Sequence, residues 1–256
     1  MLTYLQLEHI LDEKLNSKAI SDYAPNGLQV EGRWEIRKII TGVTASLPLI
    51  EQAIARNADA ILVHHGYFWK SENPCIRGMK GKRIKQLLVN DINLFGYHLP
   101  LDIHPELGNN AQLAKLIGGK NLQGMEDKAN SIPMLCELET PISAAELKQK
   151  LEKALQRNIT LCDEFVADFP HKLIKTVGIC SGGGQGYIDL AAEKGCDAFI
   201  SGEISEQTTH SAREQGIYYF GCGHHATERD GIKALGEWLA KEYQLDVEFI
   251  DIDNPA

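Results

Sequence analysis

The sequence has no long hydrophobic run, no excess of basic charge and no closely spaced cysteine pair. No apolar stretch approaches the roughly 20 residues that a transmembrane helix needs, so we expect no membrane span. The start of the chain lacks a basic segment followed by an apolar one, so we expect no signal peptide and a cytoplasmic protein. The net charge of −9 argues against non-specific binding to nucleic acid, which requires lysine and arginine to neutralise phosphates.

The six cysteines are scattered, and none forms a C-x-x-C pair. This spacing argues against a structural zinc site, and a disulfide framework is not expected in a chain without an export signal. We expect most of the cysteines to be small buried hydrophobic residues. The remaining composition, 43% hydrophobic and 24% charged over 256 residues, is that of a globular protein that can bury a full core.

Short apolar runs alternate with segments of helical periodicity along the chain. The expected strands are 27–30, 38–44, 59–63, 91–98, 159–162, 175–180, 197–200, 217–220 and 247–252. The expected helices are 5–15, 49–57, 77–89, 109–117, 143–155, 187–194 and 230–242. This alternation predicts a largely parallel sheet with helices on both faces.

Matching segments occur in the same order in both halves of the chain. Gly42-Val43-Thr44 matches Gly178-Ile179-Cys180, and residues 92–96 match 217–221. If the alignment of the two halves is shifted by one more residue, His98 and Asp102 align with His224 and Glu228. The two residues of each pair are four apart. We therefore expect an internal duplication, with two similar, intertwined three-layer α/β/α halves of mostly parallel or mixed sheets, at 1–125 and 126–256.

Clusters of histidine and carboxylate residues follow the predicted strands, where open α/β sheets bind ligands. Neutral imidazole is the commonest protein metal ligand. Adjacent strand residues point to opposite faces, but at a strand end before Gly66 the rings of His64 and His65 can splay towards two ions. We therefore expect a dinuclear centre, with metals ~3.5–4 Å apart. Its predicted ligands are His64, His65, Asp102, His224 and Glu228.

Three further residues are candidates for general acid/base work beside the metals. His98 is either a ligand or a hydrogen-bond partner of one, since Pro100 argues against a helix between His98 and Asp102. Glu203 and His210 follow the strand position equivalent to His64 and His65, although an ordinary polar loop and helix cap would also explain them.

The remaining histidines have weaker signals. The ring of His225 is expected to face away from that of His224, and three others are expected at the surface: His9, His104 and His171. The segment Ser181–Gly186 has two interpretations, an anion-binding loop that presents backbone N–H groups or a tight strand-to-helix turn.

The chain resembles the Nif-three-like, YbgI-like dinuclear metal-centre family, often labelled GTP cyclohydrolase I type 2 homologues. The residues that carry the resemblance are 42–46, 63–69, 98–102, 201–203, Glu206, His210 and 223–228. The resemblance implies two α/β/α halves, a toroidal homohexamer built as a trimer of dimers, and two metals at the five ligand positions. The chain is similar to the short form of the family, which lacks an inserted domain.

Together these features predict a metal-dependent hydrolase that acts on a nucleotide or related heterocycle through a metal-activated water. Its cofactors would be two divalent ions per subunit, and the mixed ligands suit Zn, Fe, Mn, Co or Ni. The alternatives are a metal-binding or metal-delivery protein without turnover, and a structural assembly protein.

Overall fold

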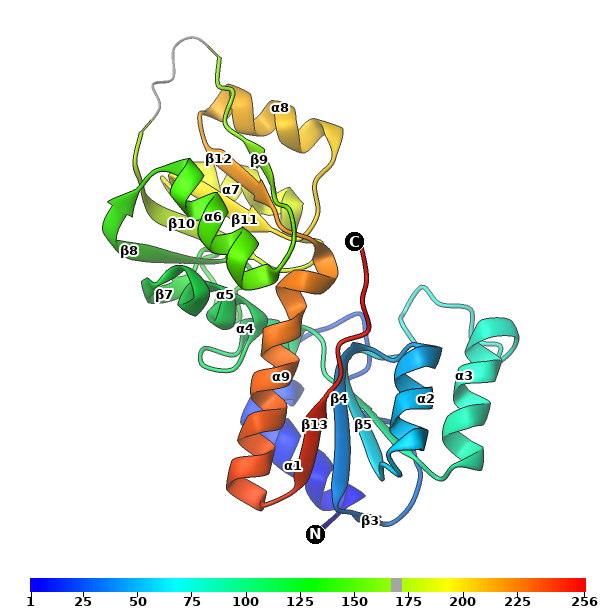
Figure 1. The fold of residues 1–256 in the computed structure, drawn as a ribbon. Helices are drawn as coiled ribbons and strands as arrows, with labels where there is room; N and C mark the ends of the chain where they lie inside the picture. Colours follow the sequence, from blue (N-terminus) through cyan, green and yellow to red (C-terminus); the bar gives the residue numbers. More distant parts are fainter. Residues whose placement is uncertain (167–171) are drawn as a thin grey trace. The chain divides into compact units, whose positions relative to one another are not determined.

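The computed structural model describes residues 1–166 and 172–256, and the chain forms two compact units (Figure 1). Unit 1 comprises Met1–Gly108 and Gly231–Asp253, and unit 2 comprises Asn109–Asp230 and Asn254–Ala256. The chain enters unit 2 at helix α5 (Asn109–Ile117) and returns to unit 1 within helix α9 (His224–Tyr243). Each unit therefore consists of two separate segments of the chain. The halves 1–125 and 126–256, which follow the sequence repeat, stay a prediction.

Unit 1 is built on a mixed sheet with the strand order β13-β4-β5-β6-β2. The strands of unit 1 are β1 (Leu2–Thr3), β2 (Gly27–Val30), β3 (Glu35–Ile36), β4 (Lys38–Thr44), β5 (Ala60–His65), β6 (Asn93–Gly96) and β13 (Asp246–Phe249). Of these, β1 and β3 pair with each other in a separate two-stranded sheet. Its helices are α1 (Tyr4–Leu15), η1 (Ser17–Ala19), α2 (Leu47–Ala55), α3 (Gly78–Val89), α4 (Leu99–Ile103) and the second part of α9. Neighbours along β13-β4-β5-β6 are parallel, and β2 is antiparallel to β6.

Helices cover both faces of the unit 1 sheet, as Figure 1 shows. On one face, α1 and α9 bury leucine and isoleucine side chains against the strands: Leu7, Leu11, Leu15, Ile232, Leu235 and Leu239 against Ile39, Leu62 and Phe95. On the other face, α2 and α3 pack against the alternate strand residues: Leu49, Ile50, Ile84 and Leu87 against Ile40, Ile61 and Leu94. Each such buried side chain contributes about 1.5–3 kcal/mol relative to an exposed one, so the sheet forms the core of the unit.

Unit 2 repeats this plan with the strand order β7-β8-β10-β11-β12-β9. Its strands are β7 (Gly119–Gly124), β8 (Met134–Ile142), β9 (Thr160–Cys162), β10 (Ile174–Cys180), β11 (Ala198–Ser201) and β12 (Tyr218–Gly221). Its helices are α5, α6 (Ala144–Leu155), η2 (Gly184–Tyr187), α7 (Ile188–Glu193), α8 (Glu206–Gln215) and the start of α9. The strands β10, β11 and β12 are parallel, and the flanking strands are antiparallel.

Two helical layers also enclose the unit 2 sheet. One layer, α5 and α6, buries Leu113, Ile117, Leu147, Leu151 and Leu155 against Val177, Ile179, Ile200 and Phe220. The other layer, α7 and α8, buries Ile188, Ala191 and Ala212 against Phe199 and Tyr219. The prediction of two similar three-layer α/β/α halves with mixed sheets is therefore confirmed.

Local sequence signals account for most helix boundaries. Helix α6 begins with a capping box, because the Ser143 side chain accepts the Glu146 N–H and the Glu146 side chain accepts the Ser143 N–H. Pro48 lies in the first turn of α2, where its missing N–H has no cost in helical hydrogen bonds. No helix in the described ranges is both long and apolar enough to cross a membrane.

Candidate metal centre

His64 and His65 both lie inside β5, so this strand runs two residues beyond the predicted one. Their rings nevertheless lie beside each other, with centroids 4.5 Å apart. Each ring contacts the end of a different neighbouring strand. His64 Nδ1 lies 3.0 Å from the carbonyl oxygen of Tyr97, which follows β6, and His65 Nδ1 lies 3.2 Å from the Thr44 hydroxyl, which ends β4.

These contacts determine which nitrogen of each ring can bind a metal. The Tyr97 carbonyl oxygen can only accept a hydrogen bond, so Nδ1 of His64 carries the proton and donates. The same reasoning applies to His98, whose Nδ1 lies 2.9 Å from the Asp22 carboxylate. In both rings Nε2 is then the ligand atom, an arrangement typical of metal-binding histidines held by an outer hydrogen bond.

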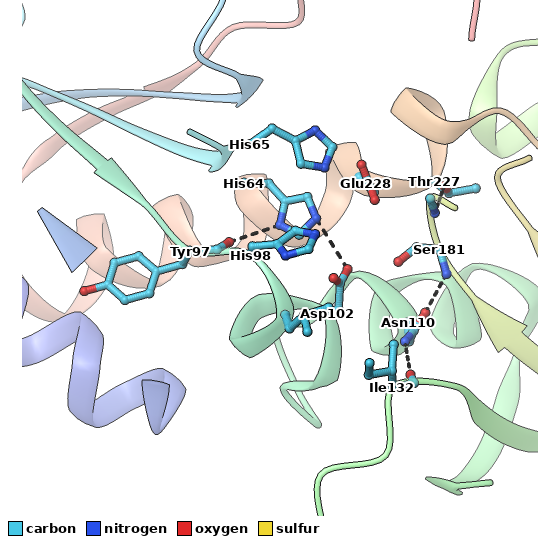
Figure 2. Close-up of polar contacts among 12 residues, drawn as sticks. His64, His65, Tyr97, His98, Asp102, Asn110, Ile132, Ser181, Thr227 and Glu228 are labelled. Carbon is cyan, nitrogen blue, oxygen red and sulfur yellow. Dashed lines mark hydrogen bonds and ion pairs between the residues drawn. The ribbon is translucent and has the colours of Figure 1, made fainter. Parts of the chain in front are cut away.

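The ligand atoms of three histidines converge in unit 1, as Figure 2 shows for His64, His65 and His98. Each offers one nitrogen, and these nitrogens lie within 4.8 Å of one another. His64 Nε2 also lies 3.5 Å from Oδ1 of the buried Asp102. Ligands about 2.0–2.2 Å from one ion are separated by distances of this order, so these side chains could hold a metal.

The expectation that Pro100 prevents a helix after His98 is wrong. Residues Leu99–Ile103 form α4, with Pro100 in its first turn, where a missing N–H disrupts no helical bond. His98 occupies the N-cap position, and Asp102 follows one turn later. His98 and Asp102 therefore share a helix end, as the duplication suggests for His224 and Glu228.

Sequence reasoning missed Asp22. Its carboxylate accepts the Leu99 N–H at 2.9 Å in addition to the His98 ring. Burial opposes ionisation of Asp22, but the hydrogen bond and charge of His98, with bonds from Asn26 and Ala24, lower its pKa to about 2. Asp22 is therefore a carboxylate that both caps α4 and orients His98, and no motif near residue 22 reveals this role.

In unit 2, helix α9 starts at His224, so His224 and Glu228 lie one turn apart on the same helix face. His224 Nε2 lies 3.4 Å from the buried Glu228 carboxylate, and His224 Nδ1 lies 2.8 Å from Glu203. The hydrogen bond to Glu228 is the main cause that raises the pKa of His224 to about 9; burial opposes it, and Glu203 adds to it.

The other predicted residues lie in different surroundings. Glu203 follows β11 and contacts a predicted ligand directly, whereas His210 lies on an exposed face of α8 and pairs with Glu206 at 3.1 Å. The backbone N–H of His225 donates to the Ala256 carbonyl.

The first two N–H groups of the glycine-rich loop after β10 are hydrogen-bonded to side chains of unit 2. The Ser181 N–H donates to Asn110 at 2.9 Å (Figure 2), and the Gly182 N–H donates to Thr227 at 3.0 Å. A Cβ on Gly182, whose φ is +59°, would lie 2.1 Å from a Glu228 oxygen. The start of the loop thus forms the backbone wall against which Glu228 packs, and this favours the tight-turn interpretation.

Outcomes differ among the histidines expected at the surface. His9 is exposed and pairs with Glu13, as predicted. The expectation for His104 is wrong, because its ring is buried and Nδ1 accepts the N–H groups of Glu106 and Leu107; burial lowers its pKa. His171 lies outside the described residues. The cysteines are free thiols, buried except for Cys75, as expected.

With this geometry in view, the comparisons with known proteins define a class. A model of the Duf34/NIF3 family (NGG1p interacting factor 3) matches residues 2–255, and the chain belongs to this family. The family resemblance inferred from the sequence is therefore confirmed.

Individual relatives cover the whole chain. A protein of Haemophilus influenzae named GTP cyclohydrolase 1 type 2 homolog is 70% identical over 252 residues, which are 98% of this chain and 99% of that protein. A solved structure described as "protein ybgI, unknown function" is 55% identical, covers 100% of both chains and has a TM-score of 0.94. A crystal structure of TTHA1606 from Thermus thermophilus is 29% identical over 100% of both chains, with a TM-score of 0.88.

Proposed function

We propose that the protein is a dinuclear metal-dependent hydrolase that acts on a nucleotide or a related heterocycle. One observation carries the proposal. In each unit, a histidine has its Nδ1 held by an oxygen, and its Nε2 faces a buried carboxylate: His64 faces Asp102 at 3.5 Å, and His224 faces Glu228 at 3.4 Å. Two potential ligands that face each other in this way suit an ion between them.

The donor set fits a pair of divalent ions. The proposed ligands are His64, His65, Asp102, His224 and Glu228, a mixture of imidazole and carboxylate without thiolate. This mixture suits Zn, Fe, Mn, Co or Ni rather than Mg or Ca, which prefer oxygen ligands alone. When bound, a pair of such ions supplies Lewis-acid polarisation and an acidified water.

The protein's own groups have separate roles in this proposal. His98 is the proton carrier, since its ring is held at Nδ1 by the Asp22 carboxylate and its Nε2 lies among the other ligand atoms. Glu203 acts through His224, whose ring it holds, and is a positioning residue as well as a candidate base. His210 remains a predicted proton carrier, with the exposed Glu206 as its partner.

The name of the Haemophilus relative makes GTP the first substrate to test. We expect the purified protein to contain about two divalent ions per chain and to hydrolyse GTP or another nucleotide. His64→Ala should lose metal and at least about 100-fold of the activity, whereas His9→Ala, on the exposed face of α1, should match wild type. Absence of turnover by metal-loaded wild type would contradict the proposal, and metal binding without turnover would favour metal delivery.

We also propose that the chain forms a homohexamer, as its family resemblance implies. Light scattering on the purified protein should give six times the chain mass of 28.4 kDa. A monomer or dimer at working concentration would contradict this assembly and leave the hydrolase proposal unaffected.

A further inference from the structure

Two aromatic side chains, Tyr23 and Trp69, lie beside the histidines of unit 1. Their ring centroids are 5.0 and 4.9 Å from that of His98, with interplanar angles of 75° and 73°. Trp69 is also 5.8 Å from the His65 ring and 5.6 Å from Tyr23. Tyr23 is 55% exposed, so a large flat side chain faces solvent at the edge of the histidine cluster.

Hydrogen bonds hold the two aromatic residues in place. The indole N–H of Trp69 donates to the Gly66 carbonyl at 3.1 Å, directly after β5. The Lys70 N–H donates to the Tyr23 carbonyl at 2.9 Å and joins the segment of Trp69 to that of Tyr23. The two loop segments that carry the aromatic pair are therefore tied to each other and to the residue that follows β5.

Residues on both sides of Trp69 also hold its backbone in place. Phe68 adopts a left-handed conformation with φ of +63°, which is unfavourable for a bulky residue. Glu72 compensates by accepting the N–H groups of both Phe68 and Trp69, at 2.7 and 3.2 Å. Lys80 pairs with Glu72 and also lies 4.8 Å from the Phe68 ring centroid. These contacts hold the backbone of Trp69 in one conformation.

The charge of this region is opposite to that of the chain. Residues 70–85 contain six basic side chains and one acidic one, in a chain with a net charge of −9. Four of the basic residues are exposed: Lys70, Arg77, Lys82 and Lys85. Of these, Lys70 directly follows Trp69, and an aromatic surface next to an exposed cation suits a ligand that is both flat and anionic.

We propose that Tyr23 and Trp69 bind the planar heteroaromatic ring of a phosphorylated substrate, with the ring stacked on the exposed face of Tyr23 and Lys70 near the phosphate. The chemical class is therefore a nucleotide or a related phosphorylated heterocycle. The inference rests on the proposed function only for the hydrolysis of the bound ligand. Binding of the ring can be measured without turnover.

Isothermal titration calorimetry on the full-length protein tests the proposal with GTP, guanosine, adenosine and ribose 5-phosphate as probes, with and without chelator. Tyr23→Ala should weaken GTP and guanosine binding by about tenfold or more, and Tyr23→Phe should retain it. Trp34→Ala is the matched control, since Trp34 is also 55% exposed but packs edge-on against Tyr4. Lys70→Ala should weaken GTP binding and leave guanosine binding unchanged.

Ribose 5-phosphate lacks a heteroaromatic ring, so its affinity should not change in Tyr23→Ala. The proposal is overturned if Tyr23→Ala binds guanosine like wild type, or if wild type binds neither nucleoside at millimolar concentration. Hydrolysis measured in parallel separates the two proposals. Binding that depends on Tyr23 but leads to no turnover supports ring binding and contradicts the hydrolase. Turnover that is unaffected by Tyr23→Ala and Trp69→Leu supports the hydrolase and contradicts ring binding.

Discussion

Unit 1 and unit 2 share a hydrogen-bonding frame that goes beyond their similar order of strands. In each unit, an aspartate just before the second parallel strand accepts two backbone N–H groups at the start of the first: Asp59 from Arg37 and Lys38, and Asp197 from Lys175 and Thr176. A basic side chain lies 2.9 Å from each aspartate, Arg33 in unit 1 and Lys172 in unit 2. The two units therefore repeat the same backbone solution to joining two parallel strands.

The ends of the second strands differ. In unit 1, β5 ends in His64 and His65, whereas in unit 2 the equivalent β11 ends at Ser201, followed by Gly202 and Glu203. Glu203 holds the ring of His224 in place, so unit 2 has an orienting carboxylate where unit 1 has imidazoles. One scaffold thus carries proposed ligands in one copy and, in the other, a group that positions the ring of a proposed ligand.

The helix ends are alike again. His98 and His224 each lie one turn before a buried carboxylate, Asp102 or Glu228, and each has its Nδ1 held by another carboxylate at 2.9 or 2.8 Å. The carboxylates that hold them come from unrelated segments. His98 therefore resembles a proposed ligand in its own right, and the comparison can be tested by changing equivalent residues in both units.

The largest effects are expected at the two buried carboxylates. Asp102→Ala and Glu228→Ala should each reduce metal affinity by about 100-fold or more, because each removes a proposed oxygen ligand. Equilibrium dialysis with metal analysis measures this, and Glu35→Ala, an exposed strand residue, is the control. A loss in one variant and none in the other would show that the two units contribute unequally to metal binding.

A smaller effect is expected from the orienting carboxylates, and it should differ between the two units. Glu203→Ala should lower metal affinity about 10–100-fold, since it releases the ring of the proposed ligand His224. Asp22→Ala releases the ring of His98, the proposed proton carrier, so it should lower the hydrolysis rate and leave the metal content unchanged. Loss of metal in Asp22→Ala, measured by the same dialysis, would contradict this role and make His98 a ligand.

The sequence predicts the frame better than the site. The bounds of β4 and α5 were predicted as observed, because an apolar run and a helical stripe mark them. Helix α8 was missed, since only Thr208 and Ala212 are buried along its ten residues and leave no apolar stripe. Strand β8 was missed although buried residues alternate with more exposed ones along its first half.

The orienting contacts were not predictable from local patterns. Asp22 is 76 residues from His98, and Tyr97 holds His64 through a main-chain oxygen that any residue would provide. Spacing in sequence reveals candidate ligands that share a helix, such as His224 and Glu228, but not the partners that tertiary folding brings to them. The candidate ligands could therefore be predicted from the sequence, and their outer hydrogen bonds could not.

A moderate loss of stability is expected at the shared aspartates. Asp59→Asn and Asp197→Asn should each lower the free energy of unfolding by about 1–3 kcal/mol, because each leaves partly buried N–H groups with a weaker acceptor. The three tryptophans, Trp34, Trp69 and Trp238, lie in unit 1, so urea unfolding followed by tryptophan fluorescence reports on that unit. Asp59→Asn should shift this signal, and Asp197→Asn should shift only far-UV circular dichroism if the units unfold separately.

The pH dependence of the Asp197 contribution has a definite sign. Burial opposes ionisation, but the Thr176 N–H, Lys172 and the Lys175 N–H lower the pKa of Asp197. A carboxylate with a lowered pKa stabilises the folded state above its unfolded pKa, and that contribution disappears as pH falls through the folded value. The difference between wild type and Asp197→Asn should therefore shrink with acidification below about pH 4.

The smallest effects are expected at two capping boxes, one in each unit. Thr3 with Gln6 starts α1, and Ser143 with Glu146 starts α6. Thr3→Ala and Ser143→Ala should each destabilise the protein by about 1 kcal/mol, measured as a change in the thermal midpoint. The backbone and side-chain hydrogen bonds of Ser143 lower the pKa of Glu146, so this cap should weaken in acid, whereas the neutral Gln6 makes the α1 cap independent of pH. Equal pH dependence in the two variants would contradict the assignment of Glu146 as the charged partner.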